Sequence, residues 1–190
     1  MDRINEYLEQ LHLDKNISLE DMPEIDLYMD QVIQLFENKF NDTKRNEEEK
    51  VLTKTMINNY AKGKLFVPIK NKKYSKDHLI LISLIYQLKG ALSIKDIKDT
   101  LEKLNHKVQD EQFSLDELYK GYLNLYNKNV ESFQKDVHER VQEVKNEAFP
   151  VDESDRDYLE KILLLASLVN MSNFYRRAAE LIVDDLSEQK

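Results

Sequence analysis

The chain has 190 residues, a formal net charge of −8 and no cysteine. This length allows one or two domains with a hydrophobic core, and the lack of cysteine excludes disulfides, thiolate metal sites and cysteine nucleophiles. Only three glycines and three prolines occur. Because an all-β fold needs many turn residues, the composition favours a mostly helical protein.

The beginning of the chain, MDRINEYLEQ, has an acid at position 2 and no apolar core of signal-peptide length. The longest apolar runs are far shorter than the ~20 residues that a membrane span requires. We therefore expect a soluble, cytoplasmic protein with no membrane partner.

Residues 1–23 are expected to form an N-terminal helix and a linker. Ile4, Tyr7, Leu8 and Leu11 have helical spacing. Pro23 suits the first turn of a second helix, which we expect to continue to about Phe40 because apolar residues recur every three or four positions.

Residues 24–106 give the pattern helix, loop, helix, hairpin, helix, helix. Thr53 is a suitable N-cap for a helix that ends at Lys62, before Gly63. The apolar residues of 65–74, arranged around Asn71-Lys72-Lys73, predict a small β-hairpin. Helices starting at Ser75 and Ser93 are expected to follow it. This order of elements is that of a winged helix-turn-helix domain.

The charge of the chain is distributed unevenly. Residues 51–76 contain seven lysines and no acid, although the protein as a whole is acidic. On the helix at 53–62, Met56, Ile57 and Tyr60 share one face, and the polar residues share the other. Asparagine can pair with adenine in the major groove, and lysine binds phosphate. The predicted DNA-binding residues are Lys54, Thr55, Asn58, Asn59, Lys62, Lys64, Lys70, Lys72, Lys73 and Tyr74.

The segment from Thr53 to Leu104 resembles the DNA-binding half of mercuric-resistance-type (MerR) regulators. The residues in register with that family's pattern are Ile57, Tyr60, Leu65, Pro68, Tyr74-Ser75 and Ser93-Ile-Lys-Asp-Ile-Lys. The segments 25–32 and 52–60 are similar to a bacterial family of unknown function that shares this half, over roughly residues 20–110. The resemblance implies a MerR-like winged helix-turn-helix fold and binding to double-stranded DNA.

The chain also departs from the MerR pattern. Thr55 and Asn58 stand where those regulators usually have arginines, and Asn59 replaces one of two paired aromatic residues. The wing, which is the predicted hairpin at residues 65–74, is shorter than the wing of those regulators and lacks its usual glycine and arginines. Lysine does not reproduce the bidentate contact of arginine with guanine, so the base specificity of the family is not carried over. Metal sensing is not carried over either, because no cysteine is present.

Residues 107–190 are expected to form a helical dimerisation or effector region. A stripe of apolar residues recurs every three or four positions from Leu115 to Ala148, which predicts one long helix. A narrow stripe of this kind is typical of a helix with a single partner helix, and we expect a homodimer formed through the C-terminal helices. Pro150 should end this helix, and a final helix should run from about Ser154 to Leu186.

These observations predict a sequence-specific or semi-specific DNA-binding transcriptional regulator. The helix at 53–62 would enter the major groove, and the lysine-rich wing would contact the DNA backbone. The alternative is a helical protein-interaction module that retains the winged-helix fold and binds an acidic protein. A lysine-rich segment can also be merely a solvated surface. The sequence has no catalytic, metal-binding or cofactor motif, so we expect no enzyme activity, and the effector is unknown.

Overall fold

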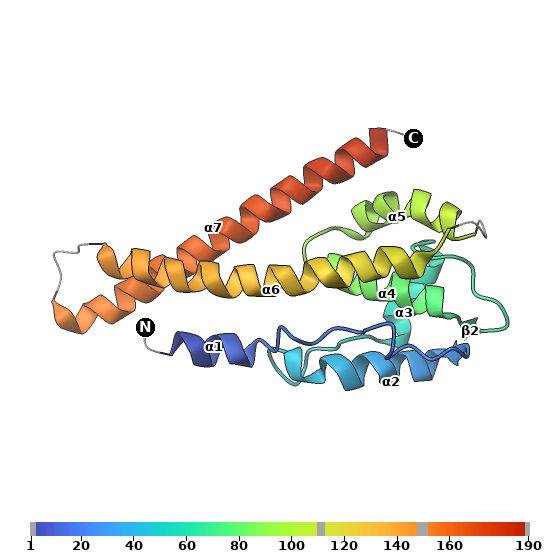
Figure 1. The fold of residues 1–190 in the computed structure, drawn as a ribbon, viewed down its shortest axis with the longest axis horizontal. Coiled ribbons are helices and arrows are strands. Elements are labelled where there is room, and N and C mark those ends of the chain that lie inside the picture. The colour runs from blue at the N-terminus through green and yellow to red at the C-terminus, as the bar shows by residue number, and fades with distance from the viewer. Residues whose placement is uncertain (1–2, 110–112, 148–151, 189–190) are drawn as a thin grey trace.

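The computed structural model describes residues 3–109, 113–147 and 152–188, which are mostly helical with one small two-stranded antiparallel sheet (Figure 1). The expected mostly helical class is confirmed. None of the described helices is both long and apolar enough to cross a membrane. In chain order the elements are α1 (Ile4–Gln10), β1 (Leu27–Tyr28), α2 (Met29–Phe40), the short 3₁₀ helix η1 (Asn41–Thr43), α3 (Lys54–Lys62), β2 (Lys73–Tyr74), α4 (Lys76–Leu88), α5 (Ile94–Val108), α6 (Leu115–Asn146) and α7 (Glu153–Glu188).

Helix α4 lies at the centre of the main core. Its residues Leu79, Ile80, Leu81 and Ile82 are all fully buried, so apolar side chains point in every direction around this turn. A helix that is apolar on all sides needs neighbours on all sides. Residues of α2, α3, α5 and the first turns of α6 provide them within one continuous hydrophobic cluster.

Helix α6 runs along most of the length of the molecule, and α7 crosses it and then diverges over α5 (Figure 1). With 32 residues, α6 is about 48 Å long. Its first turns bury Leu115 and Tyr119 in the main core. Its last turns bury Val141 and Val144 against Leu164 of α7.

The long helix predicted from the apolar stripe of residues 115–148 is therefore confirmed from Leu115 to Asn146. Most buried members of the stripe pack against other helices of the same chain. Ala148 and Pro150 lie outside the described residues.

The segment after α1 is more than a linker. Ile17 and Met22 are buried in the main core. The hydroxyl of Tyr119 donates a hydrogen bond to the Ile17 carbonyl at 2.7 Å, and Tyr126 makes a longer contact of 3.4 Å with the Lys15 carbonyl. Burial raises the pKa of Tyr119 to about 12, so its hydroxyl keeps the proton that it donates.

The helix expected from Pro23 begins later, at Met29. The preceding residues Leu27 and Tyr28 are extended because they pair antiparallel with Tyr74 and Lys73, which are distant in sequence. The side chain of Gln31 then accepts a hydrogen bond from the Tyr28 amide at 2.8 Å and caps the helix.

The Tyr119→Phe substitution tests whether the N-terminal segment is fixed by the contact with Ile17. It should lower the free energy of unfolding by about 1 kcal/mol, because the buried Ile17 carbonyl loses its donor. Urea denaturation measures the change. Tyr126→Phe is the matched control and should cost less, since its contact is longer and weaker. Equal losses in the two variants would contradict the assignment.

Candidate nucleic-acid interface

Helix α3 presents one packed face and one exposed face, as its sequence predicts. The Thr53 hydroxyl accepts the Met56 amide at 3.1 Å and caps the helix. Ile57 and Tyr60 are buried in the core. The opposite face is exposed and contains every predicted binding residue of this helix: Lys54, Thr55, Asn58, Asn59 and Lys62.

The end of α3 is fixed by two backbone hydrogen bonds. The Lys64 amide donates to the Ala61 carbonyl at 3.1 Å, and the Leu65 amide donates to the Tyr60 carbonyl at 3.0 Å. In this arrangement, the Schellman motif, the left-handed residue is usually glycine, but here it is Lys64, with φ of 58°. A Cβ atom at Gly63 would lie 2.6 Å from Leu65 Cδ1, so a larger residue there would require the Leu65 side chain to shift.

The wing is a tight turn rather than a full hairpin. The Lys73 amide donates to the Lys70 carbonyl at 2.9 Å, and the two residues between them, Asn71 and Lys72, both have positive φ angles. Two central residues with positive φ define a type I′ turn, the usual tip of a two-residue hairpin. Apart from the bridge between Lys70 and Lys73, no strand pairing connects the two arms of the predicted hairpin, because β2 pairs with β1 instead.

Tyr74 does not belong to the exposed surface. It is 1% exposed and packs edge-on against Phe66 and His78 in the core. Its alternation with Lys73 on the short strand β2 turns its side chain inward, so its predicted role in DNA binding is corrected to a role in anchoring the wing.

Two buried side chains that were not among the predicted site residues hold the wing in place. His78 Nδ1 accepts the Ser75 amide at 3.1 Å, while the other ring nitrogen, Nε2, donates to the Val67 carbonyl at 3.1 Å. Asn105 of α5 donates to the Leu65 carbonyl at 3.0 Å. The spacing of Ser75 and His78 is that of a capping box, and it is the signal that could have revealed the first of these contacts.

The lysines of residues 51–76 differ in their local partners. Lys54 lies 2.7 Å from Asp30, and Lys76 lies between Glu24 and Asp116 at 3.4 and 3.1 Å. Lys73 lies over the ring of Tyr28. Among the described residues, no acid forms an ion pair with the four remaining lysines, which lie at the end of α3 and in the wing: Lys62, Lys64, Lys70 and Lys72.

The described residues contain no group of three or more His, Asp or Glu side chains arranged to hold a metal ion. The exposed face of α3 and the wing presents amide, hydroxyl and ammonium groups. Such groups bind anions and the edges of bases.

The pH dependence of stability tests the contacts of His78. Burial has the largest effect on the pKa of His78 and lowers it below its ordinary 6.5. The unfolded chain then binds the proton more tightly than the folded chain. The contribution of neutral His78 to the free energy of unfolding should be fully present above pH 6.5. It should be lost as the pH falls through the lowered pKa of the folded state.

Urea unfolding of the wild type and of His78→Gln, at about pH 7.5 and about pH 5.5, measures this effect. Glutamine can accept the Ser75 amide but does not titrate, so the variant should lose less stability on acidification. The exposed histidines are present in both proteins and serve as a common background. Identical pH profiles would show that His78 does not contribute.

Comparison with known proteins places the chain in a family. A family model described as a domain of unknown function, DUF1836, matches residues 17–122. No curated protein and no solved structure matches the chain. The matched segment begins at the buried Ile17, includes the whole lysine-rich surface, ends within α6, and covers more than half of the chain. The expected relation to an uncharacterised family is confirmed: the chain belongs to the DUF1836 family.

Proposed function

We propose that this protein is a DNA-binding transcriptional regulator in which α3 enters the major groove and the wing contacts the backbone. The observation that carries the proposal is the segregation of α3, whose apolar face is buried while all five polar candidates are exposed. The order α2, α3, wing, α4, α5 agrees with the order that the resemblance to MerR regulators implies, which supports the proposal. The segment 51–105 has eleven lysines and four acids, a net charge of +7 in an acidic chain, and would attract a polyanion.

The roles of the side chains follow from their chemistry. Asn58 and Asn59 offer paired donors and acceptors that match the edge of adenine. Lys62 and Lys64, at the end of α3, and Lys72, at the tip of the wing, would neutralise phosphates without reading the sequence. Base specificity therefore depends mainly on the two asparagines and on DNA shape.

A second candidate is a module that binds an acidic protein through the same lysines. It is favoured by the acids beside this surface, since Asp26 and Asp77 line the same cavity as Lys70 and Lys73. Carboxylates at this position would repel DNA phosphates. A protein partner can place its own cations beside them.

We also propose that the protein forms a homodimer through the C-terminal half of α7. One face of this segment packs on the core through Val183, but large apolar side chains on other faces remain exposed: Phe174, Tyr175, Leu181 and Ile182. Arg177 and Asp184 are seven residues apart and therefore lie on the same side of the helix. In an antiparallel pair of identical helices, each arginine would lie near the partner's aspartate, so a second copy matches this surface in charge and apolar character.

The salt dependence of binding to a random-sequence DNA duplex tests the main proposal. If about six phosphates are neutralised, the slope of log K against log salt should be near −5. The double variant Lys72→Glu and Lys73→Glu should weaken binding at least tenfold and make the slope shallower by about two. The matched control is Lys128→Glu with Lys135→Glu on α6, which changes net charge equally and should bind nearly as the wild type.

Polyglutamate, titrated in parallel, separates the two candidates. Binding to DNA that is absent at low salt or indifferent to salt would overturn the regulator. If the wild type binds polyglutamate but not DNA, and the Lys72→Glu and Lys73→Glu double variant loses this binding, the protein-interaction module would be supported instead.

Sedimentation equilibrium tests the dimer. The wild type should be dimeric, and Leu181→Glu should be monomeric, because a charge in the centre of the apolar face loses its hydration on pairing. Ile25→Glu is the control, since Ile25 is 72% exposed and lies far from α7 in the sequence. A monomeric wild type, or a Leu181→Glu variant that remains dimeric, would contradict this interface.

A further inference from the structure

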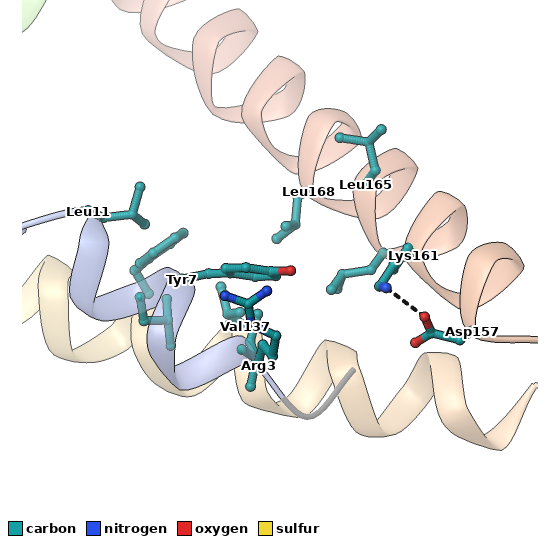
Figure 2. A pocket seen from close by; sticks show the side chains of 12 residues that line it. Arg3, Tyr7, Leu11, Val137, Asp157, Lys161, Leu165 and Leu168 are labelled. Atoms are coloured by element: carbon teal, nitrogen blue, oxygen red, sulfur yellow. Dashed lines mark hydrogen bonds and ion pairs between the residues drawn. The ribbon is translucent and has the colours of Figure 1, made fainter. Parts of the chain in front are cut away.

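A pocket of about 520 Å³ lies where α1, α6 and α7 meet, and Figure 2 shows its walls. This volume lies in the range of small-molecule sites, about 300 to 1,000 Å³. The pocket is separate from α3 and the wing, none of whose residues line it. The residues that line this pocket are therefore different from those assigned to DNA binding.

The walls of the pocket are large apolar side chains that remain partly exposed to solvent. Tyr7 and Leu11 of α1 are each 46% exposed, Phe133 of α6 is 38% exposed, and Leu165 of α7 is 58% exposed. The floor is formed by the buried residues Val137 and Leu164. In a concave site with an apolar floor and partly exposed apolar walls, replacing the water with a hydrocarbon is favourable, because it removes apolar surface from water.

Two cations from segments far apart in the sequence line the pocket: Arg3, just before α1, and Lys161 of α7. Arg3 lies against the ring of Tyr7, with its guanidinium carbon 5.7 Å from the ring centre, and Lys161 of α7 forms an ion pair with Asp157 at 2.5 Å (Figure 2). The hydrogen bond with Asp157 raises the pKa of Lys161, while the positive charge of Arg3 acts against that shift. Both cations line the same pocket.

Arg3 and Lys161 each have more hydrogen-bond donors than their ion pairs with Glu6 and Asp157 use. A guanidinium has five N–H donors, and Glu6 accepts the Nε–H of Arg3 at 2.6 Å. The ammonium of Lys161 has three donors, of which Asp157 accepts one. The unused N–H donors of Arg3 and Lys161 are the groups from which an anionic ligand group would accept hydrogen bonds.

We propose that this pocket binds an amphipathic small molecule with an anionic head, of the fatty-acid class. The carboxylate would lie between Arg3 and Lys161, and the chain would lie on the apolar walls and cover Leu11, Phe133 and Leu165. The ligand would contact α1 and α7 at once, so it would fix the position of the N-terminal helix against the C-terminal one.

Isothermal titration calorimetry of the full chain with decanoate, below its micellar concentration, tests the proposal. Saturable binding with one site per chain is expected, and decan-1-ol and decyltrimethylammonium should bind at least tenfold more weakly because they lack the anionic head. Arg3→Ala should weaken decanoate binding about tenfold. Its matched control is Lys120→Ala, because Lys120 also forms an ion pair with a glutamate three residues away, yet lies outside the pocket.

A second pair of variants tests the apolar part of the site. Leu165→Trp fills the pocket and should weaken decanoate binding at least tenfold. Leu125→Trp on α6 is the control, since Leu125 is 60% exposed, close to the 58% of Leu165, and lies outside the pocket. Both positions are exposed, so neither variant should prevent folding, and circular dichroism checks this.

Three results would overturn the proposal. The first is no saturable binding by the wild type, or equal affinity for Leu165→Trp. The second is a dimer that dissociates in Leu165→Trp without decanoate binding by the wild type, which would make a second copy of the chain the occupant. The third is binding to vesicles of anionic lipid, but not to dissolved decanoate, which would assign the surface to a membrane.

Discussion

The structure depends on the need to surround α4 completely. Four consecutive residues of this helix, Leu79 to Ile82, are fully buried, and each such side chain contributes about 1.5–3 kcal/mol when removed from water. No single neighbouring helix can cover four successive directions, so α2, α3, α5 and α6 must all pack around it. The apolar faces of those helices are then used inward, and their polar faces necessarily form the surface. The exposed face of α3 is a result of this arrangement.

The molecule has two chemically different ends, which α6 connects. At one end, lysines of α3 and the wing form a polar, positively charged surface that is suited to a polyanion. At the other end, α1, α6 and α7 leave an apolar pocket with cations at its rim. The first turns of α6 belong to the main core and its last turns belong to the second cluster, so one rigid element is part of both.

Local signals allowed α3 to be predicted, since Thr53, the apolar spacing and the glycine at 63 all lie within a few residues of the helix. The pairing of β1 with β2 could not be predicted, because two-residue strands have no alternating pattern and their partners are far apart in sequence. The burial of Tyr74 follows from that pairing and was missed for the same reason. The pocket could not be predicted either, because it arises from the crossing of three helices and from no motif. The resemblance to MerR regulators implies a winged helix-turn-helix fold, which stays a prediction, and asparagine and threonine stand where that pattern usually has arginines.

The hydrogen bond between Tyr119 and Ile17 joins residues that are 102 positions apart. Contacts of such long sequence separation require the closure of a large loop before they contribute stability, and they slow folding. During synthesis, Ile17 leaves the ribosome long before Tyr119 does, so the N-terminal segment has no final docking site until α6 has begun to form. Until then the apolar residues Ile17 and Met22 must stay exposed or find temporary cover. The order in which this chain is synthesised therefore makes this early segment one of the last to reach its place.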